Sequence, residues 1–312
     1  MADTQSIIAK DGINLKEVGR LLWHGKVSIT LITFLAAFAS IVYSLSIPNV
    51  YTSSALLASK SSGGGGVSQI SSQFGGLASM AGIRLPNVGK GDTSVTIAIE
   101  TLKSRQFFRE YLYETILVEL MAATAWDSDS DTLVLDPDVY DEKTGEWVRP
   151  SNHPKGQKPT VQQAFSVFSK VSYVEEDEIN PLAGLVTISI DHISPEIAKK
   201  WVNLMIDGIN ASIREREVRE AERSIEYLKE QLRETPLLNL ETVFAQLIEE
   251  QTKKIMLAYA SKDYVFRTID PPVATELKTR PQRVRICVYG SLLGLMLGLL
   301  WALGKGVFPR RS

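Results

Sequence analysis

Aspartates between positions 126 and 159 are the first candidates for chemistry in this sequence. The segment holds six of them among four prolines: Asp127, Asp129, Asp131, Asp136, Asp138 and Asp141. Such Asp-x-Asp pairs suggest a glycosyltransferase metal site or a calcium loop. The EF-hand spacing from Asp136 fails, because Tyr140 is at the fifth position and Asp141 stands where glycine is required. We therefore predict a solvated loop with no bound metal.

Glycines and histidines offer no stronger catalytic pattern. The four glycines at 63–66 are not followed by Gly-Lys-Ser or Gly-Lys-Thr, so no phosphate-binding loop is predicted, and residues 59–91 are interpreted as a flexible loop followed by a small helix. The chain has three histidines, His24, His153 and His192, which is a thin basis for a metal or triad site. We predict no cofactor and no catalysis, while glycosyl transfer by the acidic loop remains an alternative.

Two long apolar runs near the ends of the chain define its class. The total of 34 basic and 36 acidic residues gives no charge excess that would favour nucleic acid. At about 1.5 Å per residue, residues 27–47 and 284–304 are long enough to cross a hydrocarbon core of about 30 Å. A cleavable signal peptide with Ala37 and Ala39 at its cut site is an alternative for the first run, and a buried core helix is one for the second.

The distribution of Lys and Arg predicts the orientation of these two spans. Four basic residues precede the first span and none follows it in residues 48–59. The tails 1–26 and 305–312 should then lie in the cytoplasm, with residues 48–283 outside. The second span opposes this assignment, because a basic cluster flanks its outer end: Lys278, Arg280, Arg283 and Arg285. We let the first span decide.

The second span carries a ridge of small residues, Gly290, Gly294 and Gly298. Their spacing of four residues places them on one helix face, where small side chains let helices approach closely in lipid. The ridge predicts a contact with the first span or between protomers. The only cysteine, Cys287, lies in the same span, so the exported part has no disulfide.

The exported part alternates between strand and helix patterns. Strands are predicted at 50–59, 171–175, 184–191 and 264–269, and helices at 93–125, with or without one break, and at 161–171. Ser194, Pro195 and Glu196 then form a helix start signal for a long helix at about 195–235. The exported class is therefore α+β with a long helical arm.

An apolar seam runs along the charged half of the long helix: Val218, Ala221, Ile225, Leu228 and Leu232. It is typical of a coiled coil or oligomer contact, or of a helix packed along its own domain, and both interpretations stay open. A second helix at about 239–260 should be capped by Asn239 and present one apolar face, Val243, Leu247, Ile255 and Tyr259.

Two segments give the sequence a family resemblance. Residues 269–274 contain Asp270, Pro271 and Pro272, with Pro281 just before the glycine-rich second span, and residues 73–82 read Gln-Phe-Gly-Gly-Leu-Ala-Ser-Met-Ala-Gly. Together they resemble the Wzz chain-length determinants, or polysaccharide co-polymerases. One departure is Thr275, where that family often has another proline.

The resemblance implies a membrane-proximal α+β base with a mixed sheet and a long helical arm, assembled into periplasmic rings or bells. It also implies a role in the bacterial inner membrane beside the polymerase that builds a lipid-linked polysaccharide, where the protein sets the length of O-antigen chains. The chain lacks a Walker A motif and a tyrosine-rich tail after the second span, so no fused kinase is expected.

Two other functions are weighed against chain-length control of O-antigen. One is a co-polymerase role for a capsule or exopolysaccharide, which the sequence does not separate from the first. The other is a two-span periplasmic sensor, against which the predicted cytoplasmic tails, 1–26 and 305–312, argue because they are too short for a signalling module.

Overall fold

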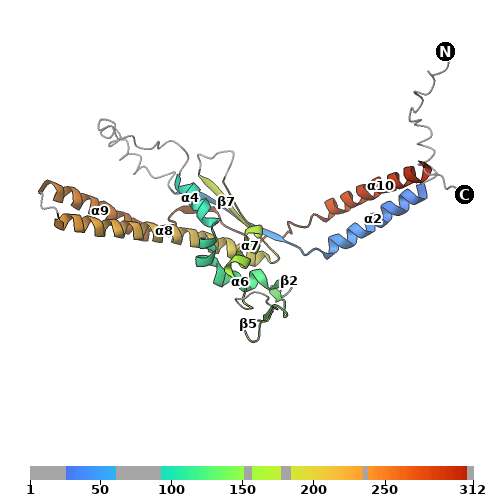
Figure 1. Ribbon diagram of the computed structural model, residues 1–312, viewed down its shortest axis with the longest axis horizontal. Coiled ribbons are helices and arrows are strands. Elements are labelled where there is room, and N and C mark those ends of the chain that lie inside the picture. Colours follow the sequence, from blue (N-terminus) through green and yellow to red (C-terminus); the bar gives the residue numbers. More distant parts are fainter. Residues whose placement is uncertain (1–25, 61–92, 151–156, 177–183, 235–237, 308–312) are drawn as a thin grey trace, which may run out of the picture. The chain divides into compact units, whose positions relative to one another are not determined.

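The computed structural model describes residues 26–60, 93–150, 157–176, 184–234 and 238–307. The chain divides into two compact units (Figure 1). Unit 1 comprises Met1–Asn49 and Lys278–Ser312, and unit 2 comprises Val50–Leu277. The loop and small helix expected at 59–91 lie almost entirely outside the described residues.

Unit 1 is an antiparallel pair of apolar helices, α2 (Lys26–Ser46) and α10 (Arg283–Val307). Both are long and apolar enough to cross a membrane. Their outward side chains are mostly large and apolar, including Phe34, Leu35 and Trp301, which are all more than half exposed. Such a surface suits lipid, since water would make its exposure costly.

Unit 2 is built on a four-stranded sheet with the order β6-β7-β1-β8. The strands are β1 (Tyr51–Ser59), β6 (Ser172–Glu176), β7 (Leu185–His192) and β8 (Phe266–Asp270). All neighbouring pairs are antiparallel, with Ala55 opposite Ile188, for example. The expectation of a mixed sheet was therefore wrong, because composition predicts strands but not the direction in which distant ones pair.

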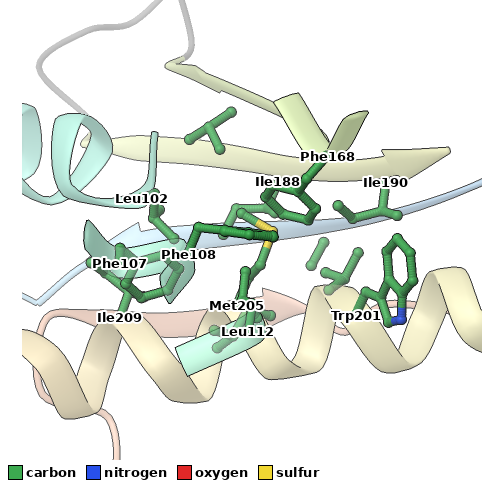
Figure 2. Close-up of a cluster of buried hydrophobic side chains, with 14 of the residues drawn as sticks. Leu102, Phe107, Phe108, Leu112, Phe168, Ile188, Ile190, Trp201, Met205 and Ile209 are labelled. Carbon is green, nitrogen blue, oxygen red and sulfur yellow. The ribbon is translucent and has the colours of Figure 1, made fainter. Parts of the chain in front are cut away.

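The core of unit 2 lies between this sheet and the helices (Figure 2). Val186, Ile188 and Ile190 alternate along β7 and are fully buried, as expected for a sheet with one packed face. They meet residues from α8 (Pro195–Glu234) and from the helices before it, including Phe108, Phe168, Trp201, Met205 and Ile209. The centre of the fold is therefore aromatic and closely packed.

The helix predicted at 93–125 is a series of shorter elements. These are α4 (Thr93–Leu102), α5 (Arg105–Phe107), the π-helix η2 (Phe108–Leu112) and α6 (Tyr113–Met121). The break after α4 has a local cause, since the Ser104 hydroxyl accepts a hydrogen bond from the Phe107 amide and caps a new helix. A further helix, α7 (Val161–Val171), starts with a capping box formed by Thr160 and Gln163.

The acidic segment is folded into small hairpins, which corrects the expected loop. β2 (Ala123–Asp127) pairs with β3 (Thr132–Leu135), and β4 (Tyr140–Asp141) pairs with β5 (Glu146–Trp147). The composition was misleading because the aspartates lie in the turns or at strand ends, while Trp126, Leu133 and Trp147 lie within the strands.

The long helix α8 packs with its first half on the core and with its second half against α9 (Leu238–Ala260). Ser194 stands just before α8, and its hydroxyl accepts from the Ile197 amide at 3.4 Å, as the start signal predicts. α9 begins at Leu238, so Asn239 lies inside the helix and is not its cap.

Candidate functional site

The glycine ridge of α10 lies against α2. A Cβ atom added at Gly294 would stand 2.5 Å from the Ala36 Cβ, and one at Gly298 would stand 3.1 Å from the Ile29 Cα. A Cβ at Gly290 would collide with the Ser40 side chain. The three glycines therefore permit a close approach of the two helices, of the kind that associates spans in lipid.

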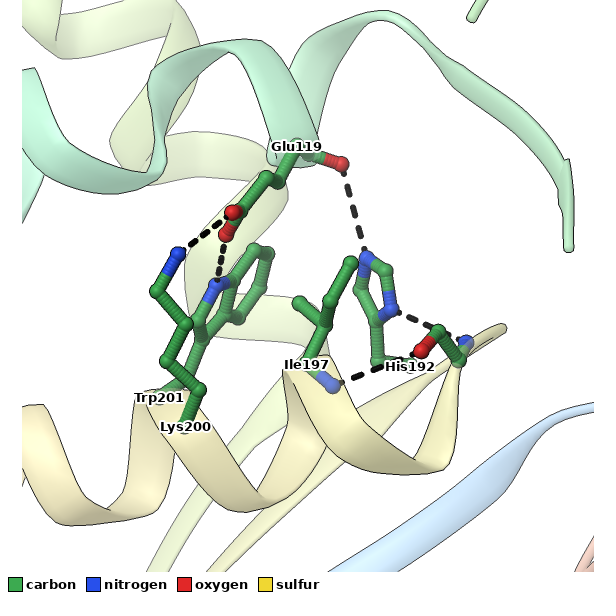
Figure 3. A network of polar contacts seen from close by, with 6 residues as sticks. Glu119, His192, Ile197, Lys200 and Trp201 are labelled. Atoms are coloured by element: carbon green, nitrogen blue, oxygen red, sulfur yellow. Dashed lines mark hydrogen bonds and ion pairs between the residues drawn. The ribbon is translucent and has the colours of Figure 1, made fainter. Parts of the chain in front are cut away.

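The start of α8 is held by a polar network around Glu119 of α6 (Figure 3). One carboxylate oxygen accepts from the Trp201 indole Nε1 at 2.7 Å, and the other accepts from Lys200 Nζ at 2.6 Å. Trp201 is fully buried, so its indole N–H requires an acceptor inside the protein. Glu119 thus connects α6 to the root of α8, by which we mean the first half of that helix, residues 195–214.

His192 completes the same network at the end of β7. Its Nδ1 accepts from the Ser194 amide at 3.0 Å, and its Nε2 lies 3.4 Å from the Glu119 carbonyl oxygen. This pattern suits the neutral ring with the proton on Nε2. Burial lowers the pKa of His192, outweighing the contacts to Glu119 and Ser194 that raise it. We infer a structural imidazole and not a proton shuttle.

Asn210 connects α8 to β8 from a buried position. Its side-chain oxygen accepts from the amides of Tyr264, Val265 and Phe266 at 3.1, 2.8 and 3.0 Å. Its Nδ2 donates to the Phe266 carbonyl at 3.1 Å. One side chain therefore fixes the segment that enters the last strand, and no periodic pattern in the sequence marked it.

Glu217 links the same junction to the returning helix α9. It accepts from the Tyr264 hydroxyl at 2.7 Å and forms an ion pair with Lys254 at 3.1 Å. Burial, followed by the neighbouring Glu217 carboxylate, raises the pKa of the Tyr264 hydroxyl, so this group remains a donor at neutral pH. Three elements, α8, α9 and the start of β8, thus meet around Glu217.

The proline segment after β8 is attached to β1. The Val273 carbonyl accepts from the Ser53 hydroxyl at 2.9 Å, and the Thr275 hydroxyl donates to the Thr52 carbonyl at 3.3 Å. Pro272 is buried, whereas Asp270 and Pro271 are exposed. Thr275, the departure noted in the sequence, therefore supplies a hydrogen bond that a proline lacks. Pro281 lies in unit 1 and is partly buried.

The seam of α8 lies along α9, within one chain. Val218 and Ala221 are buried, and the rest of the predicted seam is partly buried: Ile225, Leu228 and Leu232. On α9 the predicted apolar face was wrong in three of its four members, because Val243, Leu247 and Tyr259 are exposed and only Ile255 is partly buried. The observed inner stripe instead contains Phe244, Ile248, Gln251, Ile255 and Ala258.

This arrangement leaves α9 with large apolar side chains in solvent. Met256 is 67% exposed, Leu257 59% and Tyr259 71%, and Tyr227 of α8 is 65% exposed. Sequence analysis missed this surface because α9 has more apolar residues than one stripe accommodates. We treat these exposed side chains as candidate contacts with another molecule.

The acidic residues act as turn formers. Asp127 accepts from the Asp129 amide and the Ser130 hydroxyl, and these bonds lower the pKa of its carboxyl, the Ser130 hydroxyl most strongly. Asp131 has φ of +49° and accepts from the Trp126 indole at 2.9 Å. Within the described ranges, no group of three or more His, Cys, Asp or Glu residues could hold a metal ion. His24, His153 and residues 63–66 and 73–82 lie outside them.

Part of the sequence matches a known protein family. Residues 11–115 match the model of the Wzz family, described as chain length determinant protein. The resemblance to the Wzz family is confirmed. The match covers α2, β1, α4 and the break that follows, whereas the proline segment and both long hairpin helices lie beyond it.

Two solved structures are also similar to this chain. A full-length bacterial polysaccharide co-polymerase has 15% sequence identity and a TM-score of 0.38, with 95% of this chain and 98% of that chain covered. A fragment of WzzB, a polysaccharide co-polymerase from Salmonella Typhimurium, has 11% identity and a TM-score of 0.29, with 74% of this chain and 100% of that chain covered. No curated protein matches the sequence.

Proposed function

We propose that this protein sets the length of O-antigen chains, acting without catalysis as an oligomeric scaffold in the bacterial inner membrane. The match of residues 11–115 to a chain length determinant model carries the proposal. Two further observations support it, namely a pair of apolar terminal helices and a hairpin with several exposed large apolar side chains. The partners would be further copies of the chain, the polymerase and its lipid-linked product.

In this proposal the α8–α9 hairpin supplies the contact between copies, because Met256, Leu257 and Tyr259 are exposed there. The α2–α10 pair would anchor each copy, with both tails cytoplasmic and unit 2 in the periplasm. Removing apolar surface from water contributes about 25 cal/mol per Å². Burial of these side chains between copies would therefore stabilise a ring or bell relative to separate chains.

The test is a gel of surface lipopolysaccharide from a deletion strain, complemented with the wild-type chain or with a variant. Deletion should replace a banded length cluster by a short-biased ladder, and the wild-type chain should restore it. Gly294→Leu should fail to restore the cluster, because its side chain collides with Ala36. Ser291→Ala, on the same helix but away from the ridge, is the matched control and should restore it.

An unaltered ladder in the deletion strain would contradict the O-antigen assignment. Capsule or exopolysaccharide size would then be measured in the same strains, since a co-polymerase role there would use the same anchor and hairpin. If no polymer changes length, the family match reflects a shared fold and chain-length control is excluded.

A further inference from the structure

A basic cluster stands where α10 begins. Lys278, Arg280, Arg283 and Arg285 fall within eight residues, and all belong to unit 1. The described part of that unit, residues 26–49 and 278–307, contains no Asp or Glu. The nearest carboxylate in the sequence, Glu276, belongs to unit 2. The cluster therefore gives this part of the chain a local excess of positive charge.

This cluster also opposes the topology proposed above. Basic residues near the ends of spans favour the cytoplasmic side, yet these would face outward. A feature that works against membrane insertion requires another reason to be there. Anionic lipid head groups are known partners of Lys and Arg clusters beside spans.

Two buried donors lie at the same end of the helix pair. Arg283 donates through Nη2 to Asn49 Oδ1 at 3.1 Å, while its buried Nε has no partner among the described residues. The Ser44 hydroxyl, on a residue that is 2% exposed, is likewise unpartnered there. Gly290 packs on Ser40, so Ser44, one turn further along α2, is level with the first turn of α10.

Buried donors without an acceptor are rare, and each requires an explanation such as a bound water or ion. The amino terminus of α10 also favours an anion, because its backbone amides and helix dipole are positive there and its first turn has no acidic residue. The local chemistry is thus rich in donors and positive charge and poor in acceptors. A guanidinium is suited to a phosphate, which it binds through two parallel hydrogen bonds, and here the buried Nε is a donor without a partner among the described residues.

We propose that the start of α10 is a binding site for the phosphate group of a lipid, with Arg283 as the main contact. Arg280, Arg285 and Lys278 contribute the attractive field, and the Ser44 hydroxyl gains an acceptor when the phosphate is bound. The proposal rests on the proposed membrane anchoring of α2 and α10. Two lipids carry this chemistry, a membrane phospholipid and the carrier lipid that holds a growing polysaccharide through a phosphate.

The full-length chain in nanodiscs of phosphatidylcholine is the material for the test. Phosphatidylglycerol, an isoprenyl pyrophosphate or inorganic phosphate would be titrated in, and bound ligand would be measured by native mass spectrometry. Arg283→Gln should weaken lipid binding at least fivefold, the effect of roughly one basic residue at a membrane surface. Arg283→Lys should lose less, because it retains the charge and loses only the paired geometry.

Lys26→Gln is the matched control, since it removes one charge from the opposite end of the pair and should leave binding unchanged. Ser44→Ala should weaken binding if its hydroxyl reaches the phosphate. Unchanged binding in Ser44→Ala would remove Ser44 from the site. Equal binding by the wild-type chain and Arg283→Gln would overturn the whole proposal, and a loss in Lys26→Gln as large as in Arg283→Gln would do the same.

The three ligands distinguish the source. Tight binding of the isoprenyl pyrophosphate alone assigns the carrier lipid, and equal binding of phosphatidylglycerol assigns the bilayer head groups. If only inorganic phosphate binds, at millimolar concentration, the ligand of the site is a soluble anion and not a lipid, which would contradict the proposal. If the chain binds the lipid but its deletion leaves every polymer unchanged in length, this site is retained and the proposed function is rejected. If deletion changes the length of a polymer but the chain does not bind the lipid, the proposed function is retained and this site is rejected.

Discussion

The two halves of α8 differ in what surrounds them. In the first half Trp201, Val202, Met205 and Ile209 are all fully buried, and the polar groups of Asn210 are satisfied. Beyond Ala221 no described residue of α8 is buried, and α9 contributes one buried residue among those described, Ala258. The first half of α8 is thus stabilised by its own chain, whereas the outer hairpin leaves large apolar side chains exposed.

The largest expected effect is at the root, with Asn210→Ala. The substitution leaves three backbone amides of the β8 entry without an acceptor, and we expect a loss of about 3 kcal/mol in the free energy of unfolding. Hydrogen exchange of the full-length chain in detergent should accelerate most at Tyr264, Val265 and Phe266. Asn203→Ala is the control, because Asn203 is exposed on the same helix. Equal amide exchange rates at these three residues in the two variants would contradict the role of the Asn210 side chain in holding this segment, which we call the Asn210 clamp.

A smaller loss should follow Glu119→Ala, which removes the acceptor of the buried Trp201 indole. We expect about 2 kcal/mol from the unsatisfied donor. Lys200→Gln breaks only the half-exposed ion pair on the same carboxylate, so it should cost less than about 1 kcal/mol. Urea unfolding followed by tryptophan fluorescence compares them. Were Lys200→Gln the more harmful change, the ion pair and not the indole bond would hold the root.

A pH effect should also originate at the root. Because burial lowers the folded pKa of His192 below its ordinary value of 6.5, the unfolded chain binds the extra proton first as pH falls. Stability should therefore be full above pH 6.5 and decline below it, down to the lowered folded pKa. Thermal unfolding between pH 8 and 5 measures this, and His192→Gln should flatten the curve in that window. A wild-type curve that rises on acidification would refute the assignment.

The smallest effect on folding, and a large one on assembly, is expected in the outer hairpin. Replacing both Met256 and Tyr259 by Ser should change the free energy of unfolding by less than about 0.5 kcal/mol, because both side chains are mostly exposed. The same variant should shift the full-length chain to smaller oligomers in mass photometry. Glu249→Ser, another exposed change on α9, should not. An unchanged distribution of oligomer sizes would show that these hairpin side chains do not contribute to self-association.

The sequence predicted the elements with strong local signals. The start of α8 was correct to the residue because Ser194, Pro195 and Glu196 act through nearest neighbours. The two apolar helices followed from length and composition, and β7 from alternation along the strand. The break after α4 was open in the sequence, since a single serine within a helical pattern is a weak signal for a cap.

Candidate sites were harder to predict, because each depends on residues far apart in the chain. The glycine ridge predicted a close helix contact, but its spacing does not name the partner, which here is α2. Asn210 and Glu119 gave no signal, since an asparagine or a glutamate in a helix is unremarkable until its neighbours are known. The α9 face was misassigned because several apolar residues compete for one inner stripe.

By itself, then, the sequence determined the two apolar helices, the start of the long arm, the four strands of the main sheet and the family resemblance, since periodicity, capping and composition are local properties. Only the tertiary structure decided the antiparallel order β6-β7-β1-β8, the contact of the glycine ridge with α2 and the Asn210 clamp. It also left the Arg283 Nε and the Ser44 hydroxyl buried without partners among the described residues. These features depend on which distant segments meet, and local free energies do not encode that choice.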